Sequence, residues 1–334
     1  INTKDNRLIV DFKNTWKPFK FLTVGVSANL KYSRAKSPNT SWQTLTDYTD
    51  KVKPYTQLVD ENGNLTNIRT VSLALQNTFD KVSGLKDVTY NPINDAYQDY
   101  NTTQNFGARL NAYMHFDIWN GISADFGGTW SRTNTTYKSI SEANSYDMRL
   151  AYNSMTSKKN NSNHYVPDGD MINESRSNNE NWTIRTQINY KGQFGPHRIS
   201  ALAGNEVRRI SADSNSYETR LGYNSTAGSF SPFNIVDFKS NTFKQDLLYG
   251  NTLSSAISYG SYGLRDNRFV SWYFNGSYEY DDRYLVSGSI REDLTNFFGT
   301  NPKYRHKPLW SIGGTWKINN EKFFHADWVS RLNL

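Results

Sequence analysis

Apolar and polar residues alternate strictly along many stretches, and this period of two limits the fold more than any other feature of the sequence. Successive side chains of a β-strand point to opposite faces, so the alternation predicts strands with one apolar and one polar face. In residues 22–33 the apolar positions are Leu22, Val24, Val26, Ala28, Leu30 and Tyr32. We expect nine strands and the start of a tenth, at residues 5–16, 22–33, 106–116, 122–131, 182–190, 197–210, 267–280, 283–292, 307–318 and 327–334. A helix is expected only in residues 142–155.

The connections between these segments alternate in length. Short turns are expected at residues 17–20, 119–121, 192–196 and 281–282. Long polar connections cover about 34–104, 134–180 and 211–266, while those at 293–306 and 319–326 are shorter. Long loops without structure are uncommon in a compact soluble domain. They are typical of an outer-membrane β-barrel, which has short periplasmic turns and long extracellular loops.

The lengths and ends of the segments favour the same architecture. A strand of a soluble protein has about 5–6 residues, whereas a tilted membrane-spanning strand needs about 9–11. Aromatic residues lie near the segment ends, as in the girdles at the two membrane interfaces: Phe21 and Tyr32, Phe106 and Phe116, Trp182 and Tyr190, Trp272 and Tyr280. The opposite faces carry Arg109, His115, Arg185 and Lys191, which suits a wet lumen. Because an open sheet leaves backbone groups unpaired in hydrocarbon, we expect a larger closed barrel of which these strands are a part.

Composition excludes several other classes. The chain has no cysteine, so it has no disulfide scaffold, cysteine-ligated zinc site, iron–sulfur cluster or thiol nucleophile. No apolar run approaches the ~18–20 residues of a membrane helix. The net charge of +7 is scattered, with isolated pairs at Lys158–Lys159 and Arg208–Arg209, so we expect no nucleic-acid binding. These basic residues suit anionic lipid headgroups or acidic substrates equally well.

The two ends of the sequence also carry information. Ile1 is not an initiator methionine, and no signal peptide follows it. Residues Trp328–Leu334 stop in the middle of a strand pattern. We therefore expect residues 1–334 to be part of a single barrel domain within a longer protein.

Candidate metal and catalytic residues give weak signals. The five histidines, His115, His164, His197, His306 and His325, form no HExxH motif and no pair at metal-ligand spacing. Asp60–Asn64 and Pro167–Asp170 offer oxygen ligands but lack EF-hand spacing, so turns are favoured over calcium sites. No G-x-S-x-G motif stands at a strand-to-helix turn, and Asp281–Asp282 reads as a tight turn. We expect no enzymatic activity, no metal and no cofactor. A carboxylate pair for glycoside hydrolysis is recognised by the distance between the two groups, which a sequence does not give.

Aromatic residues in the long loops are the best candidates for substrate contact. Aromatic faces stack on sugars or peptides, and tyrosine adds a polar group. The alternative is that these rings pack the loops against one another or against a protein partner. Since the sequence does not rank them, no substrate-binding residue is assigned among Trp42, Tyr48, Tyr55, Tyr90, Tyr97, Tyr100, Tyr165, Tyr217, Tyr223 and Phe230.

The C-terminal fifth of the chain resembles the barrel strands of SusC-like TonB-dependent transporters of Bacteroidetes-type bacteria. That family shows an acidic turn followed by "YL", then "R.D", "F-G", a basic stretch and "P…S.G.W.I..E.FF". The matching residues are Tyr284, Leu285, Arg291, Asp293, Phe298, Gly299, Tyr304, Arg305, Pro308, Ser311, Gly313, Trp316, Ile318, Glu321, Phe323 and Phe324. Weaker resemblance extends upstream to Asp60–Gly63 with Asn91–Pro92, and to Ala201–Glu206.

The resemblance implies an outer-membrane importer of a Gram-negative bacterium. Such proteins are 22-stranded barrels with a plugged lumen. They take up glycans or oligosaccharides, and sometimes peptides, with a SusD-like surface lipoprotein as lid and with TonB as the source of energy. The sequence departs from the family in the turn within Arg291–Gly299, and it contains no plug, N-terminal extension or TonB box. The implied partners are therefore the lipoprotein, TonB, outer-membrane lipid and the substrate.

Two other interpretations stay open from the residues. A complete smaller barrel of about ten strands, such as a porin or adhesin, fits the alternation but not the strand patterns at the ends. A secreted β-rich domain that binds glycans fits the aromatic content of 15% but not the long strands. The substrate, the lipoprotein and the oligomeric state are beyond the sequence.

Overall fold

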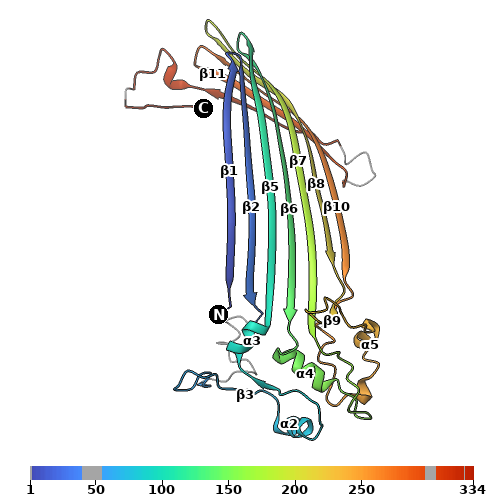
Figure 1. Ribbon diagram of the computed structural model, residues 1–334. Coiled ribbons are helices and arrows are strands. Elements are labelled where there is room, and N and C mark those ends of the chain that lie inside the picture. The colour runs from blue at the N-terminus through green and yellow to red at the C-terminus, as the bar shows by residue number, and fades with distance from the viewer. Residues whose placement is uncertain (1, 40–54, 298–305, 327) are drawn as a thin grey trace.

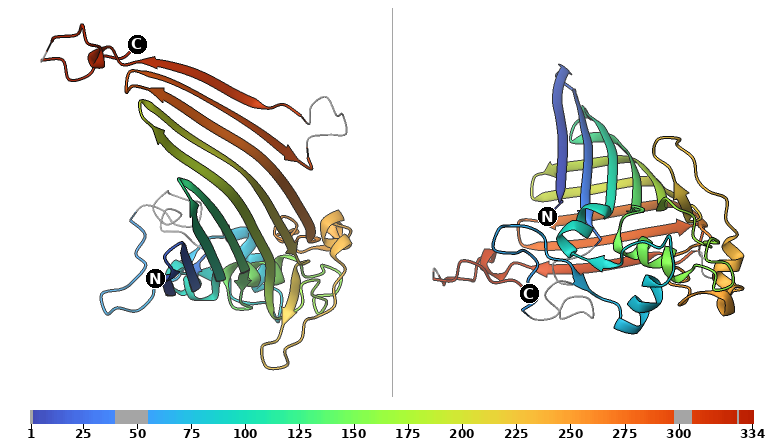
Figure 2. Two further views of the ribbon diagram at one scale, coloured as in Figure 1. Left: turned by 90° about the horizontal axis from the view of Figure 1, so that it is seen from above. Right: turned by 60° about the horizontal axis from the view of Figure 1, so that its bottom comes forward.

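A single antiparallel sheet dominates the computed structural model, which describes residues 2–39, 55–297, 306–326 and 328–334 (Figure 1). Nine long strands lie in the order of the sequence, and the short β9 (Arg220–Tyr223) pairs with the start of one of them. The long strands are β1 (Lys4–Phe19), β2 (Leu22–Pro38), β5 (Asp99–Trp119), β6 (Ile122–Ser141), β7 (Asp170–Phe194), β8 (His197–Ser216), β10 (Ser261–Tyr280), β11 (Tyr284–Thr295) and β12 (Leu309–Trp316). The sheet is not closed, since β1 and β12 form its two edges (Figure 2).

Most of these strands are longer than the alternation predicts. The strand expected at 182–190, for example, is β7 and begins at Asp170. The additional residues lie mainly at the loop end and are rich in Asn, Ser and Thr, as in Asn101–Asn105. Their side chains do not alternate in polarity, but backbone hydrogen bonds pair them all the same. With up to 25 residues, the strands exceed the about 9–11 that a bilayer requires.

The strand register collects the apolar residues on one face. Leu110 on β5 lies opposite Trp130 on β6, which lies opposite Trp182 on β7. On β10 the side chains of Trp272 and Phe274 are 55% and 47% exposed. A wide apolar face without protein cover is what a sheet presents to lipid.

Short turns gather at one end of the sheet and long connections at the other (Figure 1). Asn120 and Gly121 have φ angles of +46° and +83°, and Asp281 and Asp282 have +51° and +52°. Positive φ at both central residues marks the type I′ turn, whose twist matches that of a hairpin. The turns expected near 119–121, 192–196 and 281–282 are confirmed, and the first turn lies at residues 20–21.

The long connections carry their own secondary structure, which we call the loop lobe and define as residues 55–98, 142–169 and 217–260. The helix expected at 142–155 is confirmed as α4 (Tyr146–Ser154). Other short elements of the lobe were not expected: β3 (Ile68–Arg69), α2 (Leu73–Asp80), β4 (Thr89–Tyr90), α3 (Pro92–Gln98), α5 (Ile235–Ser240) and η1 (Lys244–Asp246). The sequence does not predict them because helices and strands this short contain too few residues to show a period.

The main hydrophobic core lies in the loop lobe rather than on the sheet. Side chains from its second and third segments form one buried cluster with Met171 of β7: Met148, Ala151, Met155, Val166, Leu221, Phe238, Leu247, Leu253 and Ile257. Leu221 and Met155 are fully buried. The two segments are therefore packed together as one folded unit.

The expected start of a tenth strand is only partly present. Residues 328–334 form no strand, because the chain turns back after η3 (Ile318–Asn320). Trp316 and Leu334 exchange two backbone hydrogen bonds of 2.8 and 2.9 Å, and Lys317 bridges to Asn333. Among the described residues, no helix combines the length and apolar character needed to cross a bilayer.

Candidate functional site

The polar face of the sheet joins side chains across several strands. Asn111 on β5 donates to Ser27 on β2 at 3.0 Å and accepts from Thr129 on β6 at 2.9 Å. The strand register alone brings these residues together, since opposite residues of paired strands share a face. Such a ladder of amides and hydroxyls presents hydrogen-bonding groups across the width of the sheet.

His115 lies on this face, as predicted, and both of its ring nitrogens contact carboxylates. Nδ1 is 2.6 Å from Asp125 Oδ1, and Nε2 is 3.3 Å from Asp117 Oδ1. Asn189 on β7 donates to the other oxygen of Asp125 at 2.6 Å. These contacts fix the imidazole within a hydrogen-bonded group at the turn end of the sheet.

A hollow of about 540 Å³ lies further along the polar face. Its principal charged pair is Arg185 on β7 and Glu206 on β8, with the guanidinium Nε 2.9 Å from the carboxylate. The carboxylate is mostly covered, whereas the arginine side chain is 58% exposed. Arg208 lines the same hollow, and its guanidinium lies 4.4 Å from the ring centre of Phe269. The hollow therefore offers two guanidinium groups and one carboxylate to a polar solute.

Alternation predicts the polar-face positions but not these contacts. Arg109, Arg185 and Lys191 share the face with His115, as expected. Tyr273 was not singled out, although its hydroxyl donates to Gln187 at 3.1 Å across two strand pairs. Counting in steps of two from Ser271 would have placed it on this face.

Most of the described loop aromatics contact neighbouring side chains, which favours the alternative interpretation for them. Tyr90 is buried against Tyr146, and Tyr165 stacks on Phe243 with ring centres 4.4 Å apart. Tyr223 packs on Phe230. Tyr100 lies in β5 beneath the ammonium of Lys36, and Tyr217 contacts the guanidiniums of Arg176 and Arg220.

Two of the aromatic candidates stay open to solvent. Tyr55 is fully exposed, and the ring of Tyr97 on α3 is 53% exposed. Trp42 and Tyr48 lie outside the described residues, as do four residues of the family pattern: Phe298, Gly299, Tyr304 and Arg305. Tyr55 and Tyr97 are thus the described loop aromatics best exposed for contact with a solute.

Asp246 connects two segments of the loop lobe. Its carboxylate accepts from Ser157 at 2.6 Å and from the hydroxyl of Tyr165 at 2.8 Å. These hydrogen bonds lower the pKa of Asp246 and raise the pKa of Tyr165, because each favours the carboxylate and the protonated phenol. The pair holds the second and third long connections together.

The acidic loop sequences form turns and ion pairs. Asp60 accepts from the backbone amides of Asn62 and Asn64 at 2.9 and 2.8 Å, and from the side chain of Asn64. These bonds lower the pKa of Asp60. Asp168 pairs with Lys86, and Asp170 accepts from the Ala143 amide. Asp60–Asn64 therefore forms the turn that the sequence favours, while Asp168 and Asp170 link their segment to neighbouring segments.

The remaining histidines lie near turns or in loops. His164 Nδ1 is hydrogen-bonded to the hydroxyl of Thr156 at 2.8 Å, and its ring stacks on Tyr152. Burial lowers the pKa of His164. His197 begins β8, and His306 is 2.7 Å from Glu292. His325 lies beyond η3. Over the described ranges, no three His, Asp or Glu side chains are grouped as metal ligands.

Comparison with known proteins gives one sequence relative and several structural ones. No family model matches the sequence. A TonB-dependent receptor, P26, of Formosa agariphila is 26% identical over 160 residues, which are 48% of this chain and 14% of the relative. The RagAB peptide transporter has a TM-score of 0.65 and 14% identity over 98% of this chain and 32% of that chain. The RagAB peptide importer in its open-open state has a TM-score of 0.63 and 16% identity, over 99% of this chain and 31% of that chain.

The chain has the fold of a section of a TonB-dependent receptor barrel. The predictions of an antiparallel barrel section and of a SusC-like resemblance are thereby confirmed. Receptors of this kind reside in the outer membrane of Gram-negative bacteria, as predicted, and they are transporters rather than enzymes. The chain spans about a third of the RagAB chains that it matches. The nine long strands form one continuous open sheet, and the loop lobe lies at one end of it.

Proposed function

We propose that this chain forms part of the barrel of a SusC-like importer, which moves a nutrient across the outer membrane. The observation that carries the proposal is the match of nearly the whole chain to the RagAB peptide transporter at a TM-score of 0.65. The open sheet supports it over a complete smaller barrel, because β1 and β12 do not pair with each other. The exposed apolar face argues against a soluble glycan-binding domain.

Two surfaces of the section suit the steps of import. The loop lobe would meet the substrate first, together with a SusD-like lipoprotein as the lid. The polar face would line the passage, where Arg185, Glu206 and Arg208 exchange hydrogen bonds with a passing solute. Opening of the passage would depend on a plug and on TonB, which act through parts of the protein outside these residues.

Among nutrient classes, we favour a peptide over an oligosaccharide. A peptide carries an ammonium, a carboxylate and amides, which match the charges of both signs and the amide ladder on the polar face. Stacking on sugars calls for free aromatic faces. Most of the loop aromatics that were candidates for such stacking are packed against neighbouring side chains instead.

Deletion of the gene for the complete receptor tests both the function and the substrate class. Growth on a peptide mixture as the sole amino-acid source should fail, and growth on oligosaccharides should continue. Complementation with Glu206→Gln should restore growth poorly, while Lys20→Gln, in an exposed short turn at the other end of the sheet, should restore it fully. If the deletion strain grows on peptides and fails on oligosaccharides, the nutrient is an oligosaccharide rather than a peptide. If it grows on both, the proposed import of these nutrients is rejected.

Purification tests the lid. The complete receptor, extracted from outer membranes in mild detergent, should bring with it a lipoprotein that binds the loop end. Recovery of the receptor alone under conditions that preserve membrane complexes would remove the lid from the proposal.

A further inference from the structure

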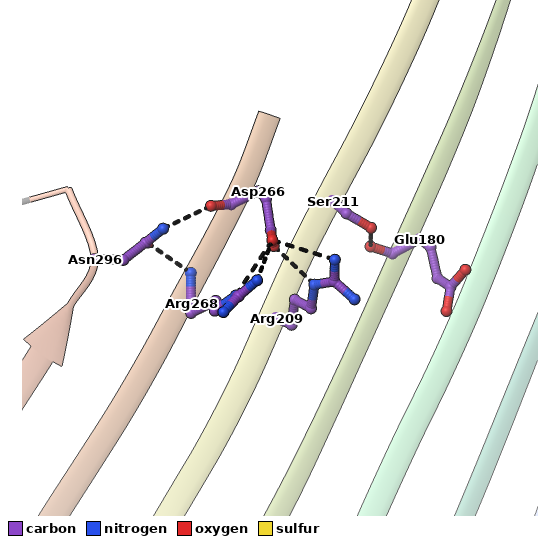
Figure 3. Close-up of polar contacts among 6 residues, drawn as sticks. All are labelled: Glu180, Arg209, Ser211, Asp266, Arg268 and Asn296. Atoms are coloured by element: carbon purple, nitrogen blue, oxygen red, sulfur yellow. Dashed lines mark hydrogen bonds and ion pairs between the residues drawn. The ribbon is translucent and has the colours of Figure 1, made fainter. Parts of the chain in front are cut away.

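Two arginines lie side by side on the apolar face, at its loop end. Arg209 on β8 and Arg268 on β10 are opposite each other in the strand register. Both bind the single carboxylate of Asp266, with Nε of Arg209 2.7 Å from Oδ1 and Nη2 of Arg268 2.7 Å from Oδ2 (Figure 3). Two guanidiniums thus share one carboxylate, and the group carries an excess positive charge.

Neighbouring residues hold this group in place. The side chain of Asn296 donates to the carbonyl of Asp266 at 2.7 Å and accepts from the amide of Arg268 at 2.8 Å (Figure 3). The other carboxylate nearby is Glu180, which accepts from the indole N–H of Trp130 at 3.1 Å. A further arginine at this height, Arg132, donates to Asn178 at 2.9 Å. The arginine pair therefore keeps an ordered position on the sheet.

The arginine pair stands at the height of the membrane interface. Arg209 is opposite Trp182, and Trp182 is opposite Trp130. Tryptophans of a membrane barrel gather at the level of the lipid headgroups. A positive group on the lipid-facing side at that level meets phosphate rather than acyl chains.

A groove of about 790 Å³ runs on the same face, nearer the middle of the apolar band. It forms because the small Ala203 lies between Ile188 and Phe274 in the register. Its apolar lining includes Phe126, Ile188, Ala203, Trp272, Phe274 and Ile290. Trp272 is four residues from Arg268 on β10, about 13 Å at a rise of 3.3 Å per residue. One acyl chain spans that distance.

We propose that this surface binds a phosphate-bearing membrane lipid, with its phosphate at Arg209 and Arg268 and an acyl chain in the groove. Guanidinium groups bind phosphate oxygens through paired, charge-assisted hydrogen bonds. The apolar side chains of the groove match the chain in polarity, while Asn205 and Glu292 add polar atoms to its lining. The site lies on the outer surface of the barrel wall, so it is separate from the passage proposed for the nutrient.

Native mass spectrometry of the complete receptor in detergent tests the proposal. Dioleoyl phosphatidic acid is titrated against dioleoylglycerol, which has the same chains without the phosphate, and inorganic phosphate is added as a soluble competitor. We expect phosphatidic acid to bind more tightly than dioleoylglycerol. Arg268→Gln should weaken its binding about fivefold, since an arginine near a membrane surface contributes on the order of that factor.

Two further variants separate the parts of the site. Ala203→Trp fills the groove without a change of charge and should also weaken binding of phosphatidic acid. Arg265→Gln is the matched control, because Arg265 stands on the same strand with its side chain on the opposite face. If Arg268→Gln misfolds by heat-dependent gel mobility, Arg209→Gln replaces it.

Three results would overturn the proposal. The first is equal affinity for phosphatidic acid and dioleoylglycerol. The second is an equal effect of Arg268→Gln and Arg265→Gln, which would indicate a general loss of charge. The third is binding of inorganic phosphate as tight as that of phosphatidic acid, because the acyl chain would then contribute nothing.

Discussion

The ring of Tyr113 on β5 covers Gly25 on β2, its partner in the strand register. A Cβ at Gly25 would lie 2.0 Å from Cε1 of the ring, and its three nearest atoms all belong to Tyr113. The aromatic side chain thus uses the space that glycine leaves open, which is a known way to stabilise glycine in a strand. The pair fixes one side of the polar face next to the hollow.

Gly25→Ala is therefore expected to destabilise the barrel. Overpacking costs typically about 1–3 kcal/mol. The double change with Tyr113→Ala should cost less than the sum of the two single changes, because the clash is then gone. Gly127→Ala, on the other side of the same ring, is the control, since its Cβ would have no neighbour nearer than 3.8 Å. Urea unfolding of the complete receptor in detergent gives the free energies, and strict additivity would contradict the expectation.

The stability of the turn end should depend on acid pH through Glu321. This largely buried carboxylate accepts from Tyr284, from Trp316 at 2.9 Å and from Arg283 at 3.0 Å. The hydrogen bonds lower the pKa of Glu321 from 4.5 to about 2. Because the pKa is lower in the folded state, ionised Glu321 stabilises the fold. This stabilisation is complete above pH 4.5 and is lost as the pH falls towards 2.

The Glu321→Gln variant measures this contribution. Its unfolding temperature should lie below that of the wild type at neutral pH, and the difference should shrink between pH 4.5 and about 2. The same substitution at the exposed Glu61 should leave the pH profile unchanged. A difference that stays constant over this window would show that the carboxylate charge has no part in the effect.

Asn153 is expected to control the attachment of the first long connection. Its fully buried side chain accepts from the Lys86 amide at 2.8 Å and donates to the Lys86 carbonyl at 2.6 Å. Asn153→Ala leaves both backbone groups without these partners, at a cost of about 1–3 kcal/mol for each unsatisfied group. Limited proteolysis should cut residues 55–98 faster, while Asn160→Ala should have no effect. Unchanged cleavage would place the attachment elsewhere.

The core of the loop lobe should unfold independently of the sheet. Leu221→Ala removes a fully buried side chain, and such changes cost about 2–5 kcal/mol. Hydrogen exchange should accelerate in residues 142–169 and 217–260 and stay slow in the strands. Leu264→Ala, at a position 70% exposed, is the control. Faster exchange throughout the sheet would instead make the lobe and the strands a single cooperative unit.

The positions of the strands follow from alternation because each strand has one apolar and one polar face. Their ends do not follow: residues 170–181 of β7 pair through backbone groups that side-chain polarity does not report. Among the short helices, α3 left a readable signal, since Asn91 caps it and Pro92 occupies its first position. Asn91–Pro92 thus carries a signal for a helix N-terminus in addition to its part in the family resemblance.

The sequence predicts which face of the sheet each residue of the candidate site occupies, but not which residues contact one another. Alternation places Arg185 on the polar face, but its ion pair with Glu206 depends on the register between β7 and β8. That register is set by the turn at Gly195–Pro196, which a sequence locates only to within a few residues. The packing of Tyr165 on Phe243 joins residues from two different long connections, a relationship that no local pattern encodes.

Each long strand of the sheet pairs with its neighbour in the chain, and tight turns set the register at one end. Insertions, deletions or wholesale replacement of the connections at the far end would leave that ladder as it is. Such a plan separates the hydrogen-bonded frame of the sheet from the connections at its far end. On the proposed import function, exchange of loop sequences on an unaltered frame would be one route to related receptors of other specificity, and grafting of these loops would test it.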